Sequence, residues 1–123
     1  MSLGLTVVHR RYVPYSHAHY ADNLVDGAYA LGLFGDVATE VCIRTDGDEG
    51  LFAGYSQVRF VAPIQAGDVV EVTASVTRVG NRSRELEFSC AVVCRGTGGS
   101  AARVLDPPVV AVVATGTVVI PAR

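Results

Sequence analysis

Two carboxylates four residues apart form the pair in this sequence with the clearest chemical use. Asp36 and Glu40 fall in a segment of helical periodicity, so they share one face, on the side of Tyr29 and Gly32 and beside an apolar stripe. A carboxylate half-buried at such a place has its pKa raised toward that of a useful general base. The same spacing suits two solvated carboxylates on an exposed helix face, and the residues alone leave both interpretations open.

All three histidines lie near the N-terminus, at positions 9, 17 and 19. His19 precedes the predicted helix, where an imidazole can shuttle a proton near neutral pH; a loop histidine bonded to the backbone is the alternative. Tyr20 and Asn23 can position a carbonyl or an amine, although Asn23 is at least as well suited to cap the helix. We interpret His9 and His17 as structural or surface residues.

Arginine is the only permanently charged basic residue in the chain, because lysine is absent and all 10 basic residues are arginines. The absence of lysine excludes Schiff-base chemistry and a phosphate-loop lysine. Arg59, Arg82 and Arg84 are candidates for binding phosphate, although each also fits an ordinary surface position. The net charge of −2 and the pI of about 5.8 argue against nucleic acid as the main partner.

Length and composition predict one folded domain over residues 1–123, because 123 residues do not suffice for two cores and 50% of them are hydrophobic. The longest wholly apolar run, Val109 to Ala114, is far shorter than the about 20 residues that cross a membrane. The N-terminus lacks the pattern of a secretory signal. Cys42, Cys90 and Cys94 have neither disulfide nor zinc spacing, so we expect small core residues in a reducing, cytoplasmic compartment.

The hydrophobic pattern predicts one long helix and five strands. The helix runs from Asn23 to about Arg44, capped by Asp22 or Asn23 and ended by the turn at 46–50. Its predicted apolar stripe is Leu24, Ala28, Leu31, Gly35, Ala38 and Cys42. The predicted strands are Leu3–Val13, Leu51–Val61, Val69–Val79, Ser83–Val93 and Val109–Ile120, with a mobile loop at 96–100 and a stiff Pro107-Pro108 approach to the last strand.

A strand, a long helix and four further antiparallel strands give an α+β arrangement that resembles the hotdog fold, with a five-stranded antiparallel sheet around the central helix. Such a sheet leaves an edge strand exposed, so we expect a homodimer at least, with a trimer of dimers as a further option. Gly27, Gly32 and Gly35 weaken the helix, which indicates close approach by another backbone, by a ligand or by both.

Two motifs flank the start and the middle of the predicted helix: His19-Tyr20-Ala21-Asp22-Asn23-Leu24-Val25-Asp26-Gly27-Ala28 and Gly35-Asp36-Val37-Ala38-Thr39-Glu40. Phe60-Val61-Ala62-Pro63, Gly67-Asp68 and Val79-Gly80-Asn81 follow, in a form general to hotdog acyl-CoA thioesterases. Together these segments resemble the hotdog-fold β-amino acyl-CoA ammonia lyases. Those enzymes interconvert β-alanyl-CoA with acrylyl-CoA, or 3-aminobutyryl-CoA with crotonyl-CoA.

The resemblance implies an enzyme without metal or redox cofactor, in which coenzyme A enters only as part of the substrate. It favours Asp36 as the base that removes the proton next to the thioester carbonyl, with Glu40 as its partner or as the ammonium-binding group. His19 is the candidate proton shuttle for the nitrogen. Free N–H groups at the helix start, around Gly27 and Ala28, can face the thioester oxygen.

The resemblance also places the acyl-CoA site between two subunits, with Arg59, Arg82 and Arg84 as candidates for the CoA phosphates. An acyl-CoA thioesterase, with Asp36 activating water, is the alternative on the same fold, and a non-catalytic acyl-CoA-binding domain is a third. A hydratase with histidine five positions after aspartate is excluded, because no histidine follows position 19. The identity of the β-amino acyl group stays open.

Overall fold

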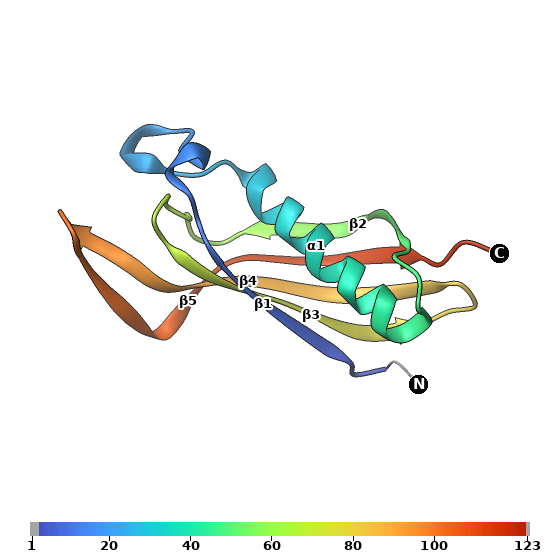
Figure 1. Ribbon diagram of the computed structural model, residues 1–123. Helices are drawn as coiled ribbons and strands as arrows, with labels where there is room; N and C mark the ends of the chain where they lie inside the picture. The colour runs from blue at the N-terminus through green and yellow to red at the C-terminus, as the bar shows by residue number, and fades with distance from the viewer. Residues whose placement is uncertain (1–2, 123) are drawn as a thin grey trace.

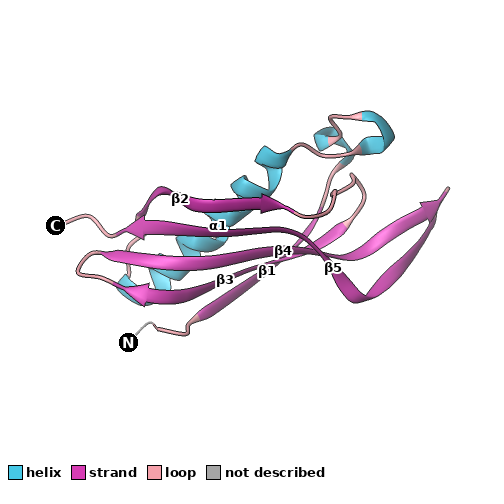
Figure 2. Ribbon diagram, turned by 180° about the vertical axis from the view of Figure 1, so that it is seen from behind, coloured by secondary structure: helices cyan, strands magenta, loops and turns pink. Residues whose placement is uncertain are grey.

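The protein is described by a computed structural model that covers residues 3–122. Its elements in chain order are β1 (Thr6–Tyr12), short 3-10 turns at Tyr15–His17 and Ala21–Asn23, α1 (Gly27–Asp46), β2 (Leu51–Phe60), β3 (Val69–Val79), β4 (Ser83–Gly98) and β5 (Ala101–Val119). The strands form one antiparallel sheet in the order β1-β3-β4-β5-β2. The helix lies across one face of the sheet (Figure 1), and Figure 2 shows the uncovered face. The predicted arrangement of one long helix on five antiparallel strands is confirmed.

The core lies between α1 and the central strands, where alternate residues point at the helix. In β3 these are Val70, Val72, Ala74 and Val76, and in β4 they are Leu86, Phe88, Cys90 and Val92. Phe34 of the helix stacks on Phe88, with ring centroids 4.9 Å apart. Period-two alternation of β-branched residues is the pattern of strands with one buried face, which is why the predicted bounds of β3 coincide with the observed ones.

The apolar face of α1 differs from the predicted stripe. The buried residues are Ala30, Leu33, Phe34, Val37, Ala38, Val41 and Cys42. Of the predicted stripe, only Ala38 and Cys42 are among them, while Ala28 is exposed. Phe34, Val37 and Val41 carry more apolar surface than the small residues of the predicted stripe, so burying them determines which side of the helix meets the sheet.

The helix begins later than predicted. Asp22 and Asn23 adopt left-handed backbone conformations, with φ of 60° and 59°, and Leu24 forms a bridge with Gln65. The helix is instead capped by Asp26, whose carboxylate accepts a hydrogen bond from the N–H of Tyr29 at 3.2 Å. Asn23 is therefore not the cap, and the predicted helix end is confirmed by Gly47 at φ 64°.

β4 and β5 are longer than predicted: they extend into the segment 94–108, which was expected to be loop, and form a two-stranded ribbon there. Pairing extends through Arg95 with Arg103 to Gly98 with Ala101, beyond the last residues that β3 and β2 contact. The ribbon projects from one end of the sheet (Figure 1). Among residues 3–122, no helix combines the length and the apolar character that a membrane crossing requires.

Candidate active site

A hollow of about 490 Å³ lies along the N-terminal half of α1 and contains Asp36. We call it the Asp36 hollow. Its lining residues are His17, Asp26, Ala28, Tyr29, Gly32, Leu33 and Asp36. The Asp36 side chain is exposed, and no hydrogen bond or ion pair joins it to another residue within 3–122. The predicted face of Asp36, Tyr29 and Gly32 thus borders a space of a size that small-molecule sites use.

Tyr29 and His17 are two aromatic groups of this hollow that the sequence did not assign to the site. The turn after β1 brings His17 against the Tyr29 ring, with centroids 4.5 Å apart. Burial raises the pKa of Tyr29; the neighbouring Cys90 and Asp36 act in the same direction and Arg11 acts against it. The phenol therefore keeps its proton and can serve as a hydrogen-bond donor. The sequence could have indicated Tyr29, because it lies two helical turns before Asp36 and so on the same helix face. No feature of the sequence indicated His17.

Glu40 takes part in a clamp between the helix and β1. One carboxylate oxygen contacts His9 Nε2 at 2.8 Å, and the other accepts a hydrogen bond from Arg44 Nε at 2.8 Å. Arg11 approaches His9 Nδ1 at 3.3 Å, so Nδ1 accepts and Nε2–H donates to Glu40. The hydrogen bonds from His9 and Arg44 lower the pKa of Glu40. Both oxygens are engaged in the protomer, and the catalytic role of Glu40 stays a prediction.

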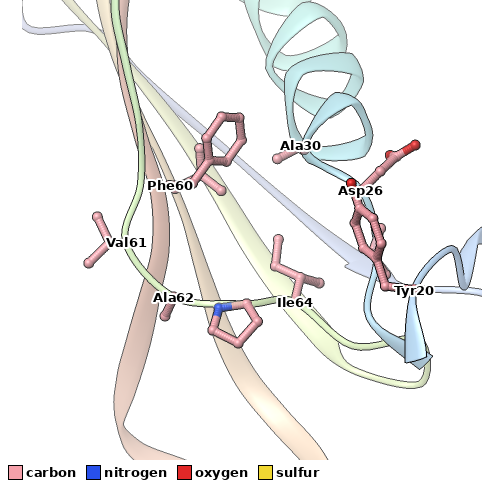
Figure 3. Close-up of a pocket in the computed structure, with 11 residues that line it drawn as sticks. Tyr20, Asp26, Ala30, Phe60, Val61, Ala62 and Ile64 are labelled. Atoms are coloured by element: carbon pink, nitrogen blue, oxygen red, sulfur yellow. The ribbon is translucent and has the colours of Figure 1, made fainter. Parts of the chain in front are cut away.

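A second hollow, of about 470 Å³, lies between the helix start and the end of β2, and most of the residues that line it are apolar. We call it the apolar hollow. Tyr20, Asp26, Gly27 and Ala30 form one wall, and the segment 60–64, which begins at the last residue of β2, forms the other (Figure 3). A Cβ on Gly27 would lie 2.8 Å from the Phe60 ring, so the close approach at this glycine comes from an aromatic side chain. Gly32 and Gly35 have open space beside them in the protomer.

The remaining predicted residues of the helix start are divided between the two hollows. Tyr20 and Gly27 line the apolar hollow, and Ala28 lines the Asp36 hollow. His19 is exposed, packs edge-on against Tyr20 at 4.6 Å and lines neither hollow. The backbone oxygen of Asn23 accepts a hydrogen bond from Ala66, so this residue joins the helix approach to the segment before β3.

The three arginines predicted to hold phosphate are not brought together. Arg59 shares a depression with Glu87 and Thr115, which lie on the sheet face turned away from α1. Arg84 is buried and pairs with Asp46 at 2.9 Å, at the C-terminal end of α1. Arg82 lies in the same region, since its oxygen accepts from Ile120. That end is about 28 Å along the axis from the helix start, so in one protomer these two arginines cannot share a ligand with the apolar hollow.

Over residues 3–122, no three His, Cys, Asp or Glu side chains lie close enough together to bind a metal ion. The three cysteines are free. Cys42 and Cys90 are buried as predicted, whereas Cys94 is only half-buried.

The chain is similar in sequence and in structure to known acyl-CoA enzymes. A family model of the thioesterase superfamily matches residues 25–101. A 3-aminobutyryl-CoA ammonia lyase from Acetoanaerobium sticklandii is 50% identical over 107 residues, which cover 85% of each chain. The solved β-alanyl-CoA:ammonia lyase from Clostridium propionicum is 36% identical with a TM-score of 0.92, covering 96% of this chain and 86% of that one. An acyl-CoA hydrolase from Staphylococcus aureus, at 18% identity and TM-score 0.75 over 95% of this chain and 63% of its own, shares the fold.

Proposed function

The chain belongs to the thioesterase superfamily and, within it, to the family of these ammonia lyases, and from this membership we propose that it reversibly eliminates ammonia from a β-amino acyl-CoA. The observation that carries the proposal is the identity of 50% over 85% of the chain to a 3-aminobutyryl-CoA ammonia lyase. The higher identity to that relative favours 3-aminobutyryl-CoA over β-alanyl-CoA as the preferred substrate.

Asp36 is the base of this proposal, because its unpaired carboxylate faces a hollow of ligand size. It removes a proton from the carbon next to the thioester carbonyl, and the electron pair of the C–H bond forms the enolate. The enolate then re-forms the carbonyl as the C–N bond breaks, and ammonia leaves the β-ammonium group with the electrons of that bond. Asp36 returns its proton to ammonia, so the net products are enoyl-CoA and ammonium.

This sequence of steps needs no separate acid, so the proposal does not depend on His19, which is exposed and lines neither hollow. Glu40 has its two oxygens engaged by His9 and Arg44, so the proposal assigns the proton transfer to Asp36 alone. The apolar hollow, lined by Phe60 and its neighbours, is suited to the uncharged pantetheine arm.

The active form of this proposal is a homo-oligomer. Among residues 3–122, β1 and β2 are the edges of the sheet and have backbone groups without a strand partner, and Leu51, Phe60 and Val61 at the β2 edge are exposed by 57% or more. An exposed apolar edge of this length favours pairing with another copy. Light scattering at micromolar concentration tests it: a mass above that of one chain supports it, and a monomer that turns over substrate contradicts it.

The activity is tested by incubating the protein with 3-aminobutyryl-CoA and β-alanyl-CoA and measuring enoyl-CoA absorbance, ammonium and free thiol. Asp36→Asn should reduce ammonium release by about 10²- to 10⁴-fold while CoA binding, measured by calorimetry, persists. Glu71→Gln, a carboxylate on the uncovered sheet face, is the matched control and should leave turnover unchanged. Thiol release without ammonium would identify a thioesterase instead, and unchanged turnover by Asp36→Asn would remove Asp36 as the base.

A further inference from the structure

An acyl-CoA carries negative charge on its phosphates, and none of the arginines predicted to bind this charge lies beside the apolar hollow. Arg84 pairs with Asp46 at the far end of α1, where Arg82 also lies. Arg59 belongs to the depression on the sheet face turned away from the helix. None of the described residues that line the apolar hollow is basic. If the pantetheine arm occupies this hollow, the cation for the phosphates must come from an element that adjoins it or from a neighbouring copy.

The β4–β5 ribbon adjoins the apolar hollow. It projects from the end of the sheet at which α1 begins (Figure 1), and Figure 2 shows the same arrangement from behind. The segment 60–68 leaves the edge strand β2 and must pass over β5 and β4 to reach β3, because the strand order is β1-β3-β4-β5-β2. Leu24, just before the helix, forms a bridge with Gln65, so the segment passes on the α1 side. Its residues 60–64 are one wall of the hollow.

Arg95 joins the base of the ribbon to this wall. Its guanidinium donates to the oxygen of Pro63 at 3.0 Å and to the two carboxylate oxygens of Asp68 at 3.0 and 2.8 Å. The Asp68 side chain is 1% exposed, so the charge of Arg95 is matched by a buried partner. Arg95 therefore shows which face of the ribbon meets the wall, and its own guanidinium is already engaged there.

Arg103 lies directly across the ribbon from Arg95. Directly opposed residues of an antiparallel pair point to the same face, and their Cα atoms lie about 5 Å apart. Arg103 therefore points to the face on which Arg95 reaches Pro63, and its side chain has the same length. Unlike Arg95, it is exposed, and no hydrogen bond or ion pair engages it within residues 3–122. The ribbon thus presents an uncommitted guanidinium beside the wall of the apolar hollow.

We propose that Arg103 binds a phosphate of the coenzyme A part of the substrate; this proposal rests on the proposed function, with the pantetheine arm in the apolar hollow. About 13 covalent bonds separate the thioester sulfur from the first phosphorus, so an extended arm spans about 15 Å. The thioester can thus lie inside the hollow while the phosphates lie outside it, at the ribbon. A guanidinium matches phosphate there with two parallel hydrogen bonds. Because the phosphates are remote from the reacting carbons, this binding is the same whichever copy supplies the base.

Arg103→Gln tests the proposal with two substrates that differ only beyond the pantetheine arm. They are 3-aminobutyryl-CoA and 3-aminobutyryl-pantetheine, which lacks the phosphates and the nucleotide. The variant should raise KM for the CoA ester by about 5- to 30-fold, with kcat and thermal unfolding close to wild type. Both kinetic constants for the pantetheine ester should stay unchanged. Arg78→Gln, an exposed arginine near the opposite end of the sheet, is the matched control and should behave as wild type.

Calorimetry with coenzyme A alone measures the same binding without turnover. The affinity of Arg103→Gln should be lower than that of wild type by a similar factor at low ionic strength. The difference should shrink in about 0.5 M salt, because an exposed ion pair is screened. A difference that is independent of salt would contradict a charge interaction with phosphate.

The outcomes separate this proposal from the function on which it rests. A wild-type protein that releases thiol without ammonium overturns the lyase activity, whereas a selective loss of coenzyme A affinity in Arg103→Gln still supports the phosphate site. A working lyase in which Arg103→Gln changes KM for the CoA ester less than twofold, or changes it equally for both esters, overturns the role of Arg103. A selective loss in Arg59→Gln or Arg82→Gln, with none in Arg103→Gln, would assign the phosphate to those arginines and would also overturn it.

Discussion

Replacing Asp68 by alanine should destabilise the protein strongly, although the residue lies outside both hollows. Its side chain is 1% exposed and accepts hydrogen bonds from Arg95 Nε at 3.0 Å, from the Arg95 terminal nitrogen at 2.8 Å and from the N–H of Gln65 at 2.8 Å. The same arginine donates to the oxygen of Pro63 at 3.0 Å. Asp68 thus ties β4 to the segment that forms one wall of the apolar hollow.

The expected loss follows from burial. Removing one partner of a buried ion pair costs about 3–5 kcal/mol. Arg95 is 24% exposed and keeps its bond to Pro63, so water can hydrate part of the freed guanidinium. We therefore expect a loss near the lower limit, about 3 kcal/mol. Asp68→Asn keeps the shape and loses the charge, and should cost about 1–2 kcal/mol.

Urea unfolding at one fixed chain concentration measures these losses, because assembly makes stability depend on concentration. Glu71→Ala is the matched control, since its ion pair with Arg10 lies at the surface, with side chains 34% and 63% exposed, and should cost no more than about 1 kcal/mol. Equal unfolding midpoints for Asp68→Ala and Glu71→Ala would refute the reasoning that burial determines the strength of this pair.

Three further results are expected. Gly27→Ala should raise KM for the acyl-CoA with little change in stability, because its Cβ would displace the exposed Phe60 ring, 2.8 Å away, into the apolar hollow; an unchanged KM would contradict this. The pKa of Glu40 is lowered by its hydrogen bonds, so its advantage over Glu40→Gln in urea unfolding should be full at neutral pH and shrink as pH falls below the ordinary value of 4.5; an advantage that is absent at neutral pH would argue against the clamp. Burial raises the pKa of Cys90 to about 12, so a thiol reagent monitored by mass spectrometry should label the half-buried Cys94 and leave Cys90 unmodified until the protein unfolds.

Much of the fold follows from local patterns. Alternation predicts β3 without error, and the turn at Gly47 predicts the end of α1. The helix start could not be predicted in this way, because Leu24 pairs with Gln65, forty-one residues later, and no local signal reports such a bridge. The ribbon was missed because its glycines and prolines read as loop, whereas the pairing of β4 with β5 keeps them extended.

In the candidate site, too, local patterns predict some features, whereas contacts distant in sequence determine others. Helical periodicity places Asp36 and Tyr29 on one face, and the structure brings them to one hollow. The engagement of Glu40 depends on His9, thirty-one residues earlier in β1, so helix spacing alone could not reveal it. The separation of Arg59 from Arg84 likewise depends on which sheet face each residue occupies, and that is a property of the tertiary fold.

The β4–β5 ribbon has a dynamic consequence. Within the described residues, β4 and β5 pair only with each other over 95–103, and no third strand adjoins them there. A lone pair of strands is barely stable in water, whereas the interior strands are held on both sides and by the helix. The amide hydrogens near Gly98 and Gly99 should consequently exchange with solvent through local opening, at a small fraction of the free energy that protects those around Val72. The molecule thus combines a slowly exchanging body with a loosely held tip that can change shape without disturbing the body.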